Sequence, residues 1–185
     1  MSGSSGPCVV CLGFFDGVHR GHLALLQAAR READRLGLPV CAHTFDRAPG
    51  EKGAELTTLR EREALLRAAG ADRVEVSAFD EAMRHTSGED FFRRVVMEKL
   101  HAVHVVCGDD HRFGYQGKCG VRELRALCDE AGIGLTVVPP VTLENGRRVS
   151  SSAVREALTV GDIASVRDML GREPSARMLA LFNTP

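Results

Sequence analysis

The sequence lacks an excess of charge of either sign. Its 24 Lys and Arg residues against 25 Asp and Glu residues leave a formal net charge of −1 with histidine neutral. A general binder of nucleic acids or of anionic membranes would usually carry a clear basic excess, so we expect neither partner. No apolar run approaches the roughly 20 residues that cross a bilayer, and the N-terminus lacks the basic and then apolar order of a signal peptide. These absences predict a cytoplasmic protein.

The chain also lacks the composition of a disordered protein, and it contains no internal repeat. Hydrophobic residues make up 44% and charged residues 26% of the 185 positions, which are ordinary values for a globular protein. This length suits one domain with a sizeable core and at most a short appendage. We expect residues 1–6 to be a flexible or tag-like lead.

A disulfide framework and a structural zinc site are both disfavoured, although the sequence contains six cysteines. Cys8, Cys11, Cys41 and Cys107 lie in apolar stretches, where a reduced thiol behaves as a small hydrophobic side chain. Cys8 and Cys11 have the spacing of a redox pair, but a predicted strand carries them and no second pair completes a zinc site. We therefore expect reduced, structural thiols, which agrees with a cytoplasmic location.

Short apolar runs alternate with helical patterns along the chain. The predicted strands cover residues 7–13, 39–45, 73–77, 103–107 and 135–138. The predicted helices run from the region of His19 to Leu36, over 59–69, from 87 to about 100 and over 121–131, and two short ones open at 150–152 and at 162. Strands that alternate with helices imply parallel pairing and right-handed crossovers, hence an α/β fold with a doubly wound, Rossmann-like parallel sheet. Ligands in such folds bind beyond the carboxyl ends of the strands, so we look for a site in the loops there.

The loop between the first strand and the first helix reads Gly13-Phe14-Phe15-Asp16-Gly17-Val18-His19-Arg20-Gly21-His22. Its three glycines allow tight turns and a close approach of a ligand, and the new helix directs free N–H groups at an anion. His19 and His22 are three residues apart, so they can face the same phosphate. The string matches neither the dinucleotide fingerprint nor the Gly-Lys-Ser/Thr phosphate loop. A surface turn with incidental histidines is the alternative, and a zinc pair is a weaker one because no acidic third ligand lies at a suitable spacing.

A second polar loop, Gly108–Gly114, follows the predicted strand at 103–107. Asp110 can accept hydrogen bonds, Arg112 can pair with phosphate, and Phe113 offers a stacking face. An ordinary polar surface loop is an equally good interpretation of this segment when it is taken alone.

A third segment, Val149-Ser150-Ser151-Ser152-Ala153-Val154-Arg155, enters a helix. Serine hydroxyls and the N–H groups of a helix start can bind oxyanions, and Arg155 can hold a phosphate in a forked geometry. A plain serine N-cap followed by a solvated arginine is the alternative for this segment alone.

Together these motifs resemble a known family. The first loop is similar to the H-x-G-H signature of the nucleotidyltransferase superfamily, and its longer form, G-x-F-D-G-x-H-x-G-H, resembles the FAD synthetase branch. That branch is the FMN-adenylylating module of the bacterial bifunctional riboflavin kinase/FMN adenylyltransferase family. The resemblance runs in register from Val9 to about Arg172, through Thr57-Thr58-Leu59 and the stretch from Phe91 to Gly108.

Three segments depart from the family pattern in part. The loop 108–114 is similar to G-x-D-F-R-F-G, with His111 in place of the first Phe. The segment 149–155 is similar to I-S-S-T-x-I-R, with Ser152 where Thr is usual. Residues 44–49 resemble T-F-D-P-H-P, with Arg47 and Ala48 as departures. The changes at 47, 48 and 111 leave room for an altered affinity for flavin or for a different substrate.

The resemblance implies transfer of AMP from ATP to FMN, giving FAD and pyrophosphate by direct in-line attack. It implies catalytic roles for His19, His22, Ser151, Ser152 and Arg155. It implies nucleotide contacts at Gly13, Phe14, Phe15, Asp16, Gly17, His19, Gly21, His22, Ser150, Ser151 and Arg155. It implies flavin contacts at Phe45, Asp46, Pro49, Asp110, Arg112, Phe113 and Gly114. Mg²⁺ is expected to be held mainly through the substrate phosphates, with no protein residues as metal ligands.

Two alternatives stay open at this point. One is a nucleotidyltransferase for another phosphorylated small molecule, and the other is a catalytically weak module that binds flavin or nucleotide. The resemblance also implies a nucleotidyltransferase domain over residues 7–172 and a tail over 173–185, where a riboflavin kinase domain would otherwise begin. We therefore expect the protein to depend on FMN made by a separate riboflavin kinase.

Overall fold

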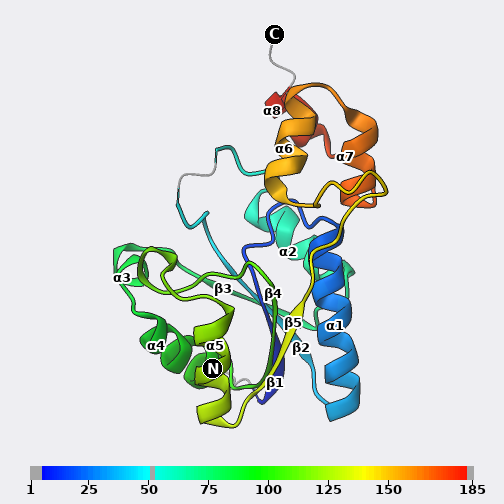
Figure 1. Cartoon of the computed structure of the whole chain (residues 1–185). Coiled ribbons are helices and arrows are strands. Elements are labelled where there is room, and N and C mark those ends of the chain that lie inside the picture. The colour runs from blue at the N-terminus through cyan, green and yellow to red at the C-terminus, as the bar shows by residue number, and fades with distance from the viewer. Residues whose placement is uncertain (1–5, 51–52, 183–185) are drawn as a thin grey trace.

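The computed structural model describes residues 6–50 and 53–182, and its centre is one parallel β-sheet (Figure 1). The strands are β1 (Cys8–Leu12), β2 (Val40–Phe45), β3 (Arg73–Ser77), β4 (Ala102–Gly108) and β5 (Gly134–Val138). They pair in the order β3-β2-β1-β4-β5, and every neighbouring pair is parallel. The predicted doubly wound α/β fold is confirmed. Of the expected lead at 1–6, residues 1–5 lie outside the described part of the chain.

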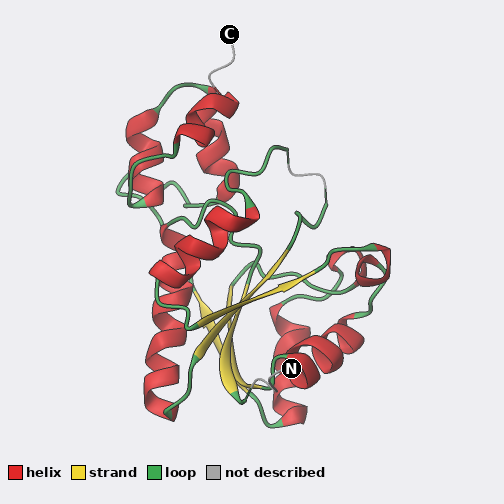
Figure 2. Ribbon diagram, turned by 180° about the vertical axis from the view of Figure 1, so that it is seen from behind, coloured by secondary structure: helices red, strands yellow, loops and turns green. Residues whose placement is uncertain are grey.

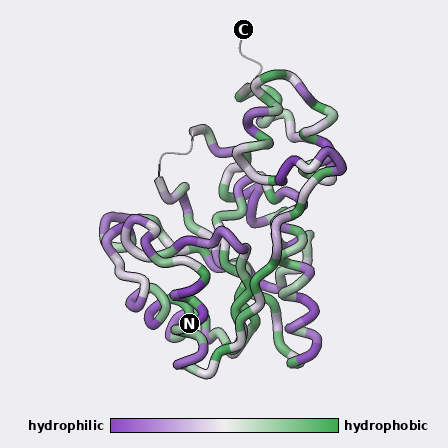
Figure 3. The backbone as a smooth tube through the Cα atoms, in the orientation of Figure 1, coloured by the Kyte–Doolittle hydropathy of each residue, from purple (hydrophilic) through white to green (hydrophobic). Residues whose placement is uncertain are grey.

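Helices cover both faces of this sheet, as Figures 1 and 2 show. On one face α1 (Arg20–Leu36) and α2 (Leu59–Ala68) pack against the strands. On the other face lie α4 (Gly88–Phe91), which continues as a π-helical segment over Phe92–Lys99, and α5 (Val121–Ala131). Figure 3 shows the strands between these layers as mostly hydrophobic and the outer parts of the helices as more hydrophilic. Six free thiols are present, and five of them are buried, as expected for reduced structural cysteines.

The helix boundaries follow from local capping. Thr58 and Glu61 form a reciprocal capping box at the start of α2, and the Ser87 hydroxyl accepts a hydrogen bond from the N–H of Asp90 (3.1 Å) at the start of α4. Gly37 ends α1 in the left-handed conformation that glycine adopts at low cost. Leu36, in the last turn of α1, is 38% exposed.

A separate group of helices closes the chain at the end of the molecule near the start of α1 (Figure 1). It consists of α6 (Ser151–Thr159), α7 (Ile163–Leu170) and α8 (Ala176–Phe182). These helices share a small core that includes Leu158, Leu170 and Met178. The sequence shows little pattern after Gly171 and predicts only a tail over residues 173–185, within which the structure describes α8. The missed helix α8 is short, so its periodicity is weak, and its packing against α6 stabilises it. The short helix α3 (Glu81–Arg84) was missed for the same reason.

The order of the strands marks where a ligand belongs. The chain runs outward from β1 through β2 to β3, and then returns to the other side of β1 with β4 and β5. The carboxyl ends of β1 and β4 therefore flank the point at which the winding reverses, where open α/β sheets bind their ligands. Within the described ranges, no helix combines the length and the apolar character needed to cross a membrane.

Candidate functional site

A cavity of about 950 Å³ opens at the reversal point of the sheet. The loops after β1, β2 and β4 and the start of α6 all contribute to its wall. Most residues that the sequence assigned to a site line this cavity: Gly13, Phe14, Phe15, Asp16, His19, Gly21, His22, Phe45, Pro49, Asp110, Arg112, Phe113, Gly114, Ser150, Ser151, Ser152 and Arg155. Gly17 and Asp46 were assigned to the site as well, and both lie outside the lining.

His19 and His22 face the cavity as a stacked pair. Their ring centroids are 3.6 Å apart at an interplanar angle of 17°. Burial lowers the pKa of His19 to about 4, and burial together with the neighbouring His19 and Arg62 charges holds the pKa of His22 well below its ordinary value. Both imidazoles are therefore neutral near pH 7. The Nδ1 atom of each ring is buried without a hydrogen-bond partner within the described part of the chain, so a ligand can supply one.

Two helices begin at this cavity. His19 caps α1 without a side-chain hydrogen bond, and the first helical hydrogen bond runs from the N–H of Leu23 to the His19 carbonyl (3.0 Å). The N–H groups of the first turn of α1 are therefore open. Ser150 caps α6 and accepts from the N–H of Ala153 (3.1 Å), which leaves the N–H groups of Ser151 and Ser152 for a ligand. Converging helix N-termini favour a polyanion such as a triphosphate.

Asp16 is a buried connector between three segments. Its side chain is 2% exposed, and its two oxygens accept hydrogen bonds from the N–H groups of Leu56 (3.1 Å) and Thr57 (3.1 Å). The same carboxylate forms an ion pair with Arg155 of α6. Because Asp16 has partners within the protein on both oxygens, it fixes the loop after β1 to residues 56–57 and to α6.

Arg155 is oriented for a ligand by this ion pair. Its Nη2 atom donates to Asp16 and its Nε atom donates to the carbonyl oxygen of Ala54 (2.9 Å). Among the described residues the Nη1 atom has no hydrogen-bond partner, and the side chain lines the cavity. A guanidinium carries five N–H donors, so Arg155 can keep both protein contacts and still bind an anion.

Ser151 also has a contact within the protein. Its hydroxyl donates to the backbone carbonyl oxygen of Asp16 (2.8 Å). That proton is not available to a phosphate while the bond persists, whereas the Ser151 N–H is. Ser152 is exposed at the start of α6, and its hydroxyl forms no hydrogen bond with the described residues.

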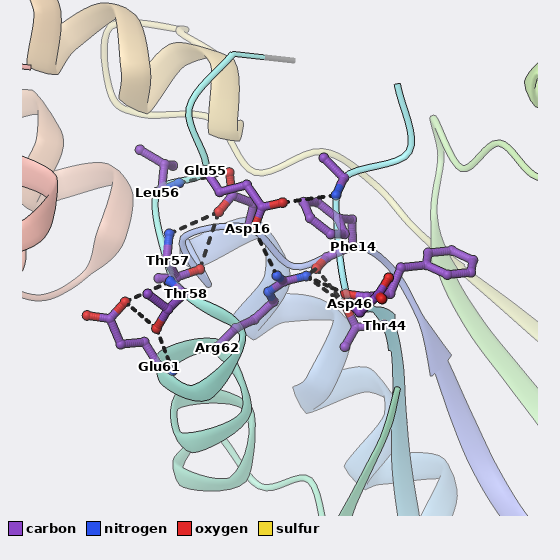
Figure 4. Close-up of polar contacts among 12 residues, drawn as sticks. Phe14, Asp16, Thr44, Asp46, Glu55, Leu56, Thr57, Thr58, Glu61 and Arg62 are labelled. Atoms are coloured by element: carbon purple, nitrogen blue, oxygen red, sulfur yellow. Dashed lines mark hydrogen bonds and ion pairs between the residues drawn. The ribbon is translucent and has the colours of Figure 1, made fainter. Parts of the chain in front are cut away.

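Arg62, which the sequence analysis missed, connects the loops behind this site (Figure 4). It is fully buried. Its Nη1 atom donates to the carbonyl oxygens of Phe14 (3.1 Å) and Phe45 (3.0 Å) and to the hydroxyl of Thr44 (3.1 Å). Its Nη2 atom pairs with Glu55 (3.2 Å), and its guanidinium carbon lies 4.1 Å from the centroid of the Phe14 ring. Burial lowers the pKa of Arg62, but an arginine keeps its charge under these conditions.

One signal in the sequence could have identified Arg62. It lies three residues after Leu59 and four before the buried Leu66, so it occupies the inward face of α2. A charged residue at such a position is almost never buried without partners. The partners themselves come from β1 and β2, and no local pattern announces them.

The opposite part of the cavity is aromatic. Phe45 packs edge-on against Phe79 (centroids 5.3 Å apart) and lies 6.4 Å from Phe91, which in turn lies 6.0 Å from Phe113. All four rings line the cavity, together with the buried His43. The sequence identified Phe45 and Phe113 only. Phe79 was missed because it follows a strand whose loop matched no motif, and Phe91 because its spacing fitted the core face of a helix.

The loop 108–114 forms the rim between the two parts. Arg148 bridges its two aspartates, with N–O distances of 2.7 Å to Asp109 and 3.0 Å to Asp110. Arg148 also lines the cavity, and the sequence analysis did not single it out. His111 stacks on Phe113 at a centroid distance of 5.9 Å, and burial lowers its pKa to about 4.

Asp46 has a structural contact instead of a place in the lining. Its Oδ1 atom accepts a hydrogen bond from the N–H of Phe79 (2.8 Å), and this bond is the main cause of its lowered pKa. Asp46 thereby joins the loop after β2 to the loop after β3 and holds Phe79 beside Phe45.

No group of three or more His, Cys, Asp or Glu side chains within residues 6–50 and 53–182 is placed to hold a metal ion. The carboxylates on the rim, Asp109 and Asp110, already lie against Arg148. These residues are therefore better suited to a hard cation that is bound through the phosphates of a ligand than to one coordinated by protein side chains alone.

Comparisons with known proteins identify the family of this chain. A family model described as FAD synthetase matches residues 2–153. The bifunctional riboflavin kinase/FMN adenylyltransferase of Pseudomonas fluorescens is 38% identical over 174 residues, which is 89% of this chain and 54% of that protein. The protein of the same description from Escherichia coli K12 is 35% identical over 170 residues, with the same shares. The chain thus spans about half the length of these curated relatives.

Solved structures share the fold. A crystal structure described as a macrolide-efflux protein from Streptococcus pneumoniae has a TM-score of 0.81 at 27% identity, covering 93% of this chain and 67% of that one. A pantoate-β-alanine ligase from Francisella tularensis has a TM-score of 0.52 at 14% identity, covering 97% and 77% respectively. The family model accounts for most of the chain, including the loops after β1 and β4, and we conclude that the chain belongs to the FAD synthetase family.

Proposed function

We propose that this chain is an FMN adenylyltransferase, which transfers AMP from ATP to the phosphate of FMN and releases pyrophosphate. The observation that carries the proposal is the composition of the cavity. One part presents stacked neutral histidines, Arg155 and the N-termini of α1 and α6, and the other part presents four phenylalanine rings. A triphosphate suits the first part, and a flat aromatic ring system suits the second.

The proposed reaction needs little from the protein besides position and charge. A terminal phosphate oxygen of FMN attacks the α-phosphorus of ATP, a new P–O bond forms, and the bond to the leaving pyrophosphate breaks on the opposite side. The nucleophile is already an anion, so no general base and no covalent intermediate are required. Orientation and neutralisation of the charge that develops on the phosphates then account for catalysis.

The proposed roles on the phosphate side follow from the contacts described above. Neutral His19 and His22 donate hydrogen bonds to phosphate oxygens and add no fixed charge of their own. Arg155 donates from Nη1 to the leaving pyrophosphate, while Asp16 holds its other side. Ser152 contributes its hydroxyl, and Ser151 contributes its N–H group in addition to anchoring the loop.

On the flavin side, Phe45 and Phe113 are proposed contacts, together with Phe79 and Phe91. Asp110, Arg112, Pro49 and Gly114 line the same region. The His111 imidazole, which replaces the family's phenylalanine, keeps an aromatic face toward Phe113 and adds a buried Nε2 atom without a partner in the described structure. We propose that this atom forms a hydrogen bond with the flavin.

We propose that Mg²⁺ takes part as the cation bound to the ATP phosphates. When bound, it supplies neutralisation of the phosphate charge and a fixed geometry for the leaving group.

A product analysis with a panel of acceptors tests the proposed substrate. The chain is incubated with ATP and Mg²⁺ and with FMN, riboflavin, a phosphorylated pantetheine or a cytidylyltransferase acceptor in separate reactions, and the products are separated. FAD from FMN alone is the expected result. An adenylylated product from another acceptor would transfer the assignment to that acceptor, and binding of FMN and ATP without any product would identify a binding module.

A further inference from the structure

Arg172 lies behind the loop 13–22, which we call the signature loop, and outside the residues that match the family model. It directly follows Gly171, the C-cap of α7. Its guanidinium donates from Nη2 to the carbonyl oxygen of Gly17 (2.6 Å) and from Nη1 to that of Val18 (2.9 Å). Arg172 is not among the residues that line the cavity. Both of these hydrogen bonds are with the signature loop.

The turn that Arg172 holds is strained. Gly17 has a φ of +80°, which glycine adopts readily, but the buried Val18 has a φ of +42°. A positive φ is a costly conformation for a β-branched residue, and it persists when the surroundings determine it. The two carbonyl oxygens are turned toward Arg172, and the next residue, His19, is the N-cap of α1 at the cavity. The two hydrogen bonds from the Arg172 guanidinium thus fix the path of the chain as it enters α1, whose N-terminus faces the cavity.

Arg172 also brings a positive charge to the loop. Within the described residues its guanidinium contacts backbone carbonyl oxygens and pairs with no carboxylate. Burial lowers its pKa, yet an arginine remains protonated at neutral pH. After burial, this charge is a further cause of the low pKa of His19, which lines the cavity.

A second contact ties the same helices together. The Nη1 atom of Arg20 donates to the carbonyl oxygen of Asp168 in α7 (3.4 Å), and the Arg20 side chain packs beside Gly171. Helix α7 is in turn buried against α6 and α8 in their common core. The C-terminal helices therefore support the first turn of α1 from outside the cavity.

We propose that Arg172 is a positioning residue for phosphate binding: it holds the Gly17–Val18 turn so that α1 presents its open N–H groups and both histidines to the triphosphate, and its charge favours the bound anion. This inference rests on the proposed function in taking that end of α1 as the phosphate site. It extends the site to a residue that touches no substrate.

The test compares Arg172→Gln with Arg167→Gln as the matched control. Arg167 is on α7, is 54% exposed and pairs with Glu173, so its replacement removes the same charge without touching the signature loop. Binding of inorganic tripolyphosphate to the intact chain is measured by calorimetry in the absence of flavin, and KM values for ATP and FMN are measured in the FAD-forming assay. The tripolyphosphate measurement remains informative if the proposed acceptor is wrong.

Arg172→Gln is expected to weaken tripolyphosphate binding and to raise the KM for ATP by about tenfold or more, because it removes the charge and the paired hydrogen bonds to the Gly17 and Val18 carbonyl oxygens. The KM for FMN is expected to stay within about twofold of the wild-type value, because Arg172 does not contact the aromatic part of the cavity. Arg172→Lys, which keeps the charge, recovers part of the binding. Unchanged tripolyphosphate binding in Arg172→Gln, or an equal loss in Arg167→Gln, would overturn the inference. If Arg172→Gln does not fold, Arg172→Lys serves as the test, because it keeps the charge and loses the two-pronged contact. Tripolyphosphate binding by Arg172→Lys that equals that of the wild type in both low and high salt would then overturn the inference.

Discussion

Replacement of Asp16 by asparagine removes one charge from the centre of the site and changes no volume. Both oxygens of Asp16 accept hydrogen bonds from N–H donors, those of Leu56 and Thr57, and one oxygen also receives Arg155. An asparagine has one carbonyl oxygen, so its amide group must face N–H donors in either orientation. The variant therefore leaves Arg155 without its counter-ion and at least one backbone N–H without an acceptor.

The size of the effect follows from the burial of the pair. The Asp16 side chain is 2% exposed and that of Arg155 is 13% exposed. Breaking a buried ion pair by removing one partner costs about 3–5 kcal/mol, and an unsatisfied buried donor costs about 1–3 kcal/mol. Because Arg155 retains some access to water, we expect a loss at the low end of the ion-pair range, about 3 kcal/mol in the free energy of unfolding.

Urea unfolding measures this loss, followed by far-UV circular dichroism because the chain contains no tryptophan. With a slope of about 2 kcal/mol per molar urea, the midpoint of Asp16→Asn falls by about 1.5 M. The control is Asp34→Asn, which removes an exposed pair with Arg30 and is expected to leave the midpoint nearly unchanged. In Asp16→Asn with Arg155→Met, part of the stability returns because the unpaired cation is gone. A midpoint for Asp16→Asn that matches wild type would refute the account of Asp16 as a buried connector.

Three further outcomes are expected. His22→Ala lowers the turnover number for FAD formation by about a hundredfold, the usual loss for a group that stabilises developing charge, and near wild-type turnover would contradict its role. Stability falls as the pH drops below the ordinary histidine pKa of 6.5, because the unfolded chain binds protons that buried His19 and His43 (folded pKa about 4 and about 3) do not. Between pH 7 and pH 5 each of these histidines lowers the free energy of unfolding by about 2 kcal/mol. Equal urea midpoints at the two pH values would exclude this effect. Gly17→Ala lowers the free energy of unfolding by about 1–2 kcal/mol, because a Cβ at a φ of +80° would lie 2.8 Å from Leu56; an unchanged midpoint would count against the strained turn.

The sheet and its flanking helices could be predicted because their signals are local. Apolar runs such as that of β4, which is buried on both faces, and the Thr58 capping box are visible in a few consecutive residues. The parallel order then places the loops after β1 and β4 beside each other, as the structure confirms. The segment Ser150–Arg155 could be predicted as the third part of the site because its serine N-cap is also a local feature.

The partners within the site could not be predicted because they are distant in the sequence. Asp16 and Arg155 are 139 residues apart, and Arg172 and Gly17 are 155 residues apart. Arg62 carried a weak signal, as a charge on an inward helix face, but no pattern tells which carbonyl oxygens it reaches. Sequence motifs thus indicated which residues gather at the site, and the structure separates those whose groups remain open to a ligand from those already held by the protein.

The transfer of the α-phosphate is the most direct measure of the central claim. Wild-type protein is incubated with FMN, Mg²⁺ and ATP that carries a radioactive label on either the α- or the γ-phosphate, and the products are separated. The account predicts that FAD carries the α-label, that pyrophosphate carries the γ-label, and that the two products form in equal amounts. Absence of the α-label from any flavin product, or release of the γ-label as inorganic phosphate, would contradict it.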